Sequence, residues 1–310
     1  MNKTVIYEIK SLYRDDFRVW GYEFGEGEQS VCVVGPMRGN EVQQLYACSQ
    51  LIRRLKEMEE KGKIKKGHKI LVIPSVNPYS MNIQKRFWPT DNTDINRMFP
   101  GYDEGETTQR IAAGVFEAIK DYKYGIQLAS FYMPGTFRPH VRMMKAGMEN
   151  VEMAKKFGMP YVVLRNTRPY DTTTLNYNWQ VWETNAFSLY TTTTSTVDKV
   201  SAYQAIRSIL NFLSKEGIVE YYGHDGYISM VVEDTDMVSV RTRKSGIFES
   251  KVAVGQEISK GQVLAEIIDP YEGEVIDTLI SPVDGSIFFR HNDPLTYAST
   301  AVFKLIVGSR

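Results

Sequence analysis

The chain lacks the features of a secreted or membrane-spanning protein. It has only two cysteines, Cys32 and Cys48, in 310 residues, too few for a disulfide framework, so we expect reduced, buried thiols in a reducing compartment. No stretch approaches the roughly 18 to 20 apolar residues of a transmembrane helix. The residues after Met1 also show no apolar core of the signal-peptide type. These absences predict a cytoplasmic protein.

Net charge and histidine are scarce as well. Lys plus Arg and Asp plus Glu both number 37, so no overall field attracts nucleic acid or an anionic membrane, and we expect neither as a partner. Four histidines are present: His68, His140, His224 and His291. Few imidazoles are therefore available as metal ligands.

The first two thirds of the chain alternate between strand-like and helical patterns. Short apolar runs, typical of buried strands, alternate with amphipathic segments, and a long loop over 75–105 follows the second run. The expected strands are 31–34, 70–74, 124–128 and 161–164, and the expected helices are 39–61, 107–122, 151–157 and 202–213. This alternation predicts an α/β domain with its site at the carboxyl ends of the strands.

The character of the sequence changes near Tyr227. From there, short β-type runs alternate with Gly, Pro and Asp turns, as in the segments 245–248, 254–264 and 281–287. Such spacing is typical of a small all-β module. We therefore expect an α/β domain over residues 1–225 and a β-module over 226–310.

Three motifs carry a resemblance to a known family. They are Gly35-Pro-Met-Arg-Gly-Asn-Glu41, Asn77-Pro78 followed by Arg86-Phe87, and Asp94-Ile-Asn-Arg-Met-Phe-Pro-Gly101. In order and spacing they resemble the succinylglutamate desuccinylase/aspartoacylase family of zinc-dependent deacylases. The resemblance implies a zinc-carboxypeptidase-like mixed sheet flanked by helices, with a small C-terminal all-β, barrel-sandwich-like module. It also implies zinc-assisted hydrolysis of the amide bond of N-acyl amino acids.

The residues that the resemblance assigns to zinc and catalysis are mostly replaced. Glu41 stands at the carboxylate ligand, but Arg38 and Ala129 stand at the two histidine ligands and Thr193 at the catalytic glutamate. A guanidinium and a methyl group offer no lone pair to a metal, and functional zinc sites normally have three or four protein ligands. We therefore expect no cofactor and no intact catalytic residue in this copy.

Two orientations of Arg38 follow from the same residues. Its guanidinium can turn inward and pair with Glu41 in place of the metal, or turn outward while Glu41 caps the next helix. Of the four histidines, His140 is the one that follows the altered strand closely. An active metal-dependent deacylase with a site rebuilt from Glu41 and His140 is therefore the alternative function.

The resemblance also implies a grip on the substrate carboxylate by Asn96 and Arg97, with Arg86 as a second cationic contact. A planar guanidinium suits bidentate carboxylate recognition. In the competing interpretation, Asp94, Arg97 and Phe99 are kept because an Asp–Arg pair and a buried Phe hold the long loop together. The leading hypothesis is a non-hydrolytic relative that binds a small carboxylated ligand, such as an amino acid or N-acyl amino acid. A third hypothesis is a structural subunit that pairs with an active paralogue. A homo-oligomer is the other assembly that we consider.

Overall fold

The computed structural model describes residues 1–308 and divides into two compact units. Unit 1 comprises residues 1–130 and 139–231, and unit 2 comprises residues 131–138 and those from 232 onward. The division thus falls between Val231 and Val232 rather than at the expected 225/226. Unit 2 also takes the short segment 131–138, which the sequence had placed in the first domain.

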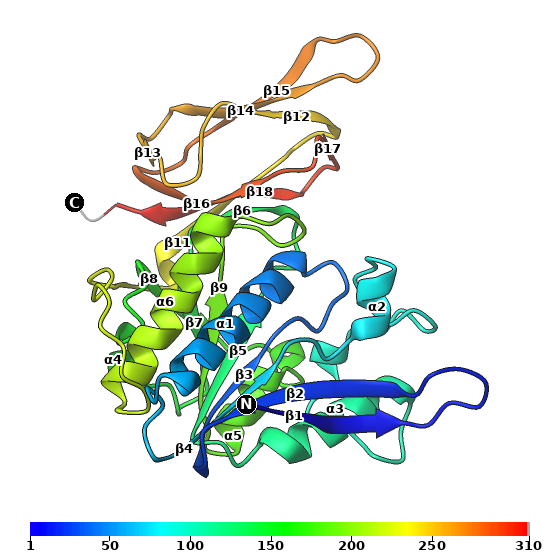
Figure 1. Cartoon of the computed structure of the whole chain (residues 1–310). Coiled ribbons are helices and arrows are strands. Elements are labelled where there is room, and N and C mark those ends of the chain that lie inside the picture. Colours follow the sequence, from blue (N-terminus) through cyan, green and yellow to red (C-terminus); the bar gives the residue numbers. More distant parts are fainter. Residues whose placement is uncertain (309–310) are drawn as a thin grey trace. The chain divides into compact units, whose positions relative to one another are not determined.

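A nine-stranded mixed sheet forms the centre of unit 1, in the order β1-β2-β4-β3-β5-β9-β7-β8-β10 (Figure 1). Its strands are β1 (Asn2–Ile9), β2 (Phe17–Phe24), β3 (Gly27–Val34), β4 (Gly67–Ile73), β5 (Tyr124–Ala129), β7 (His140–Lys145), β8 (Tyr161–Asn166), β9 (Asn185–Tyr190) and β10 (Met230–Glu233). Strands β4, β3, β5 and β9 are parallel neighbours, whereas β2 and β7 flank them in the antiparallel sense. The mixed sheet predicted from the resemblance is confirmed.

Helices cover both faces of this sheet because successive strand residues point to opposite sides. Val31 and Val33 share a buried cluster with residues of α1 and α6, whereas Cys32 and Val34 pack with residues of α3 and α5. The helices are α1 (Val42–Glu60), α2 (Pro78–Asn82), α3 (Thr107–Ile119), α4 (Val151–Lys155), α5 (Leu175–Val181) and α6 (Lys199–Lys215), with short 3-10 turns η1 (Ile95–Arg97) and η2 (Pro169–Asp171). None of the helices in residues 1–308 has the length and apolar character needed to span a bilayer.

The expected long loop over 75–105 contains local structure. Asn77 caps α2, since its side-chain oxygen accepts the N–H of Ser80 at 3.1 Å. Asp94 likewise caps η1 by accepting the N–H of Asn96 at 3.1 Å. Asp and Asn at such positions satisfy donors that a helix leaves open. Two of the polar motif residues therefore shape the backbone of this segment.

Unit 2 is all-β, as predicted. One sheet has the order β11-β18-β16-β13 with β6 paired to β16, and the other has the order β15-β14-β12-β17. The strands are β6 (Gly135–Phe137), β11 (Met237–Arg241), β12 (Gly246–Ser250), β13 (Glu257–Ile258), β14 (Val263–Ile268), β15 (Val275–Ile280), β16 (Gly285–His291), β17 (Leu295–Thr296) and β18 (Ala301–Val307), preceded by η3 (Asp234–Asp236). Apolar residues of both sheets form one core that includes Leu264, Ile267 and Phe303.

Candidate functional site

The segments that resemble the family's catalytic motifs meet at one edge of the unit 1 sheet. Strands β3, β5 and β9 are parallel neighbours, so the residues that follow them lie at the same edge. Gln44 of α1 ties two of these ends together. Its side-chain amide donates to the carbonyl oxygens of Ala129 at 3.2 Å and Thr193 at 3.4 Å. The edge predicted from the sequence is therefore where these residues gather.

Arg38 turns inward. Its side chain is buried, with Nη1 donating to Glu41 Oε1 at 3.1 Å, and with Nε and Nη2 donating to Asp94 Oδ2 at 3.0 and 2.8 Å. Burial alone would lower the pKa of Arg38, but the carboxylates of Glu41 and Asp94 outweigh it and hold the pKa above its ordinary value. The inward orientation, one of the two alternatives left by the sequence, is the one present.

The carboxylate of Glu41, only 3% exposed, is fully engaged by protein donors. Oε2 accepts the backbone N–H groups of Met37 at 2.9 Å and Arg38 at 3.1 Å, and Oε1 accepts Arg38 Nη1 and the hydroxyl of Ser130. Two carboxylate oxygens offer about four lone-pair directions, and four donors occupy them here. Glu41 makes no side-chain cap to α1, so the capping alternative is wrong.

The residues present do not fit the zinc that the resemblance implies. The two expected histidine positions fail as ligands, because Arg38 carries a cation and Ala129 ends in a methyl group. At the position of the catalytic glutamate, Thr193 donates its hydroxyl to the carbonyl of Thr196 at 2.7 Å. Over residues 1–308, no group of three or more His, Cys, Asp and Glu side chains is placed to hold a metal. Arg38 instead supplies the positive charge that Glu41 and Asp94 require when buried.

His140 lies at the start of β7, opposite the last residue of β9. Its buried ring stacks on that of Tyr190, with centroids 4.6 Å apart and planes 3° from parallel. Arg142 lies two residues further along β7, and its guanidinium carbon is 4.3 Å from the centre of the same ring. His140 therefore has an aromatic packing role, and the metal role considered in the alternative function stays a prediction.

The loop residues expected to contact a carboxylate are joined to the chain near α5. Asn96 Oδ1 accepts the N–H of Leu175 at 3.2 Å, and Arg97 Nη1 donates to the carbonyl of Tyr170 at 2.9 Å. Arg97 Nη1 is also 3.6 Å from a carboxylate oxygen of Asp171. These contacts support the structural interpretation for Asn96. Arg97 keeps 33% of its side chain exposed, and its guanidinium has further N–H donors besides the Nη1 group bonded to Tyr170.

Arg86 lies in the electrostatic field of the same cluster. Burial lowers its pKa, and the nearby Arg38 guanidinium lowers it further, with a smaller contribution of the same sign from Arg97. Asp94 and Glu41 oppose this shift without cancelling it. Arg86 thus lies among two guanidinium groups, Arg38 and Arg97, and two carboxylates, Glu41 and Asp94.

Sequence reasoning missed two members of the cluster. Asp94 was considered only as a residue that could hold the loop, yet it binds Arg38 through two N–H groups. Ser130 was not considered, although it follows Ala129 directly at the end of β5 and donates to Glu41. Its position next to Ala129, where the family has a metal ligand, was the signal that could have identified it.

A family model for the succinylglutamate desuccinylase/aspartoacylase catalytic domain matches residues 28–214. The chain belongs to this family. A curated relative is N-alpha-acetyl-L-2,4-diaminobutyric acid deacetylase from Halomonas elongata, which is 24% identical over 261 residues and covers 79% of this chain and 72% of that protein.

Solved structures of the succinylglutamate desuccinylase/aspartoacylase family share the fold along nearly the whole chain. A succinylglutamate desuccinylase from Silicibacter sp. has a TM-score of 0.83 at 16% identity and covers 98% of this chain and 93% of its own. The product-bound ectoine utilization protein EutE (DoeB) from Ruegeria pomeroyi has a TM-score of 0.78 at 18% identity, with 94% and 90% covered. Family membership and fold are thus shown together, and the family is one of deacylases.

Proposed function

We propose that this member of the deacylase family is non-hydrolytic and binds a small carboxylated ligand, such as an amino acid or an N-acyl amino acid. The observation that carries the proposal is the closed cluster of Arg38, Glu41 and Asp94. The carboxylate that would bind zinc has its lone pairs occupied by protein donors, and a guanidinium stands where a metal ligand is expected. A guanidinium cannot activate a water molecule as a bound zinc ion does.

The binding half of the proposal rests on the cationic loop. Arg86 and Arg97 flank the buried cluster, and Arg97 presents a partly exposed guanidinium. Charge-assisted, bidentate hydrogen bonds to a carboxylate are the interaction that this group favours. The ligand's carboxylate would be held between Arg86 and Arg97, beside the buried cluster of Arg38, Glu41 and Asp94. The two buried, free cysteines fit a reducing compartment, and the cytoplasm stays our proposal for location.

Metal analysis tests the non-hydrolytic half. Protein purified without chelator is expected to contain no stoichiometric zinc or other divalent ion, and not to release the acyl group from N-acetyl or N-succinyl amino acids. Stoichiometric metal that disappears in Glu41→Ala, together with amide hydrolysis, would overturn it. That result would instead support the deacylase rebuilt around Glu41 and His140.

A thermal-shift screen of amino acids and their N-acyl derivatives tests the binding half. At least one carboxylate is expected to raise the melting temperature, since a ligand at 100 times its Kd stabilises the native state by about 2.7 kcal/mol. Arg97→Ala should abolish the shift and Arg97→Lys should retain part of it. The matched control is Arg54→Ala on the exposed face of α1, where the shift should persist. If no carboxylate raises the melting temperature and Arg97→Ala changes nothing, the proposal fails. A stable complex with a second family member and no ligand response would favour the structural-subunit hypothesis.

A further inference from the structure

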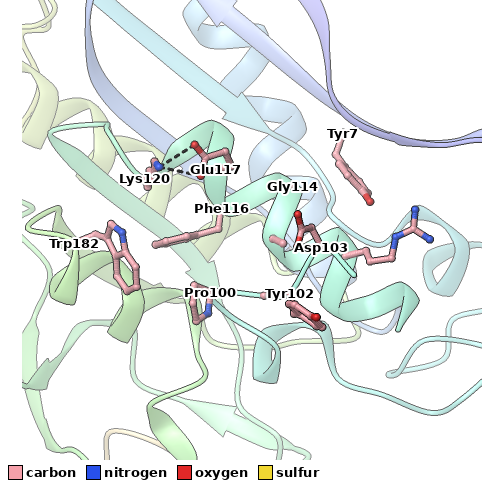
Figure 2. A pocket seen from close by; sticks show the side chains of 12 residues that line it. Tyr7, Pro100, Tyr102, Asp103, Gly114, Phe116, Glu117, Lys120 and Trp182 are labelled. Carbon is pink, nitrogen blue, oxygen red and sulfur yellow. Dashed lines mark hydrogen bonds and ion pairs between the residues drawn. The ribbon is translucent and has the colours of Figure 1, made fainter. Parts of the chain in front are cut away.

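A concave surface of unit 1 has none of the residues of the Arg38 cluster in its lining (Figure 2). Its volume is about 550 Å³, within the range of about 300 to 1,000 Å³ that is usual for small-molecule sites. Residues from β1, from the segment 100–103, from α3 and from the end of α5 line it. Of the lining residues, only Pro100 and Gly101 belong to a motif that resembles the deacylase family, the segment 94–101.

One wall of this cavity is aromatic. The rings of Phe116 and Trp182 meet edge to face, with centroids 5.2 Å apart and an interplanar angle of 87°. Trp182 is 45% exposed and Tyr102 is 52% exposed, so both present ring surface to the cavity. Tyr7 of β1 adds a further ring and lies directly over Gly114, where a β-carbon would come within 2.1 Å of it. Exposed aromatic surface of this kind favours a partner with an apolar body.

The charged groups of the cavity are balanced but not all paired. Lys120 and Glu117 neutralise each other at 2.8 Å, as the dashed lines in Figure 2 show. Asp103 and Arg110 also line the cavity. Within residues 1–308, neither of these two side chains has an ion-pair or hydrogen-bond partner. Arg110 lies one helical turn before Gly114, on the face of α3 that forms the cavity.

We propose that this cavity binds a free α-amino acid with an aromatic side chain. Its carboxylate would pair with Arg110, its ammonium with Asp103, and its ring would pack on Trp182 and Phe116. One unpaired group of each sign suits a zwitterion better than an anion or a cation, because a singly charged ligand leaves one of the two groups uncompensated. The inference concerns a different surface from the proposed carboxylate site and does not depend on it.

Titration calorimetry of the full chain with L-phenylalanine and L-tryptophan tests the site. Saturable binding is expected, and Arg110→Gln and Asp103→Asn should each weaken it by about 10-fold to 100-fold, as expected for loss of a hydrogen bond between charged groups. N-acetyl-phenylalanine lacks the ammonium, so its binding should be insensitive to Asp103→Asn. Lys120→Gln, which removes a cation already paired within the cavity, serves as the matched control and should change affinity by less than about 3-fold.

Two results would overturn the inference. The first is the absence of binding by either amino acid at millimolar concentration. The second is binding that is unchanged in Arg110→Gln and Asp103→Asn but lost in Arg97→Ala, since the ligand would then occupy the other site. Because Arg97 lies outside this cavity, Arg97→Ala should leave the binding of L-phenylalanine intact. Failure of the carboxylate proposal is thus distinguishable from failure of this one.

Discussion

Replacing Arg38 by alanine should strongly destabilise unit 1. The guanidinium makes three hydrogen bonds of 2.8 to 3.1 Å to the carboxylates of Glu41 and Asp94. Glu41 is 3% exposed, so Arg38→Ala leaves it without its countercharge in a poorly solvated place. Removing one partner of a buried ion pair typically costs about 3 to 5 kcal/mol. For a domain of about 150 to 250 residues, each kcal/mol lowers Tm by roughly 2 to 4 °C, which gives a loss of about 10 °C.

Tryptophan fluorescence is the appropriate assay. The four tryptophans, Trp20, Trp88, Trp179 and Trp182, all lie in unit 1, so thermal unfolding followed by their emission reports that unit alone. The control is Arg54→Ala, which breaks an exposed pair with Glu57 at 3.0 Å. Exposed pairs contribute about 0.2 to 1 kcal/mol, so this control should lower Tm by no more than about 4 °C.

A combined variant separates lost charge compensation from lost packing. Arg38→Met with Glu41→Gln and Asp94→Asn removes all three charges and keeps most of the volume. Because neutral replacements of buried ion pairs are often close to neutral in stability, this variant should recover much of the lost Tm. If Arg38→Ala unfolds at the same temperature as Arg54→Ala, the cluster does not compensate buried charge and the reasoning about the site is refuted.

Three further predictions concern other parts of the molecule. Burial raises the pKa of Cys32, and raises that of Cys48 to about 12. Neither thiol should therefore react with Ellman's reagent at pH 8 in the native protein, whereas both should react in denaturant. A fast-reacting thiol in the native protein would contradict this. Burial also lowers the pKa of His291 against the opposing effect of Asp293, so the unfolded state binds a proton at higher pH than the folded state does. Unit 2 should therefore lose stability as pH falls below about 6.5, which hydrogen exchange of the β16 amides would measure. His291→Gln should flatten this pH dependence, and an equally steep dependence in that variant would refute the assignment. Gly101 has φ of 101°, and a β-carbon there would lie 2.1 Å from the backbone nitrogen of Ala113, so Gly101→Ala should lower the Tm of unit 1 by several degrees.

The parts of the fold that the sequence predicted correctly have clear hydrophobic periodicity. The core of α1, with Leu51 and Leu55, and the apolar run of β3 repeat at helical and strand spacing, and both were recognised. The β1–β2 hairpin was missed because its strands mix charged and aromatic residues over a partly exposed surface. Strand β7 was missed because it carries the polar residues His140 and Arg142, which both pack on the ring of Tyr190.

The candidate site shows the same limit. The replacement of the expected metal ligands by Arg38 and Ala129 follows from the resemblance to the family, whose motif residues are otherwise retained around Arg38. The contact between Arg38 and Asp94 joins residues 56 positions apart, and it depends on how the 75–105 segment folds back with α2 and η1. Periodicity contains no information on that path, so the second carboxylate that binds Arg38 could be found only from the three-dimensional arrangement.

The short segment 131–138 limits how the protein can be dissected. It leaves unit 1 after β5, pairs as β6 with β16 of unit 2, and returns to begin β7. The ring of Phe137 stacks on those of Phe131 and Phe289, with ring centroids 3.7 and 4.5 Å apart. A chain shortened after Val231 would remove the β16 partner of this segment and expose Phe131 and Phe137 to water. Loss of ligand response in such a truncation would therefore reflect the exposed segment 131–138 and not the missing C-terminal unit itself. Replacing this segment by a short polar linker in the same truncation would remove that ambiguity.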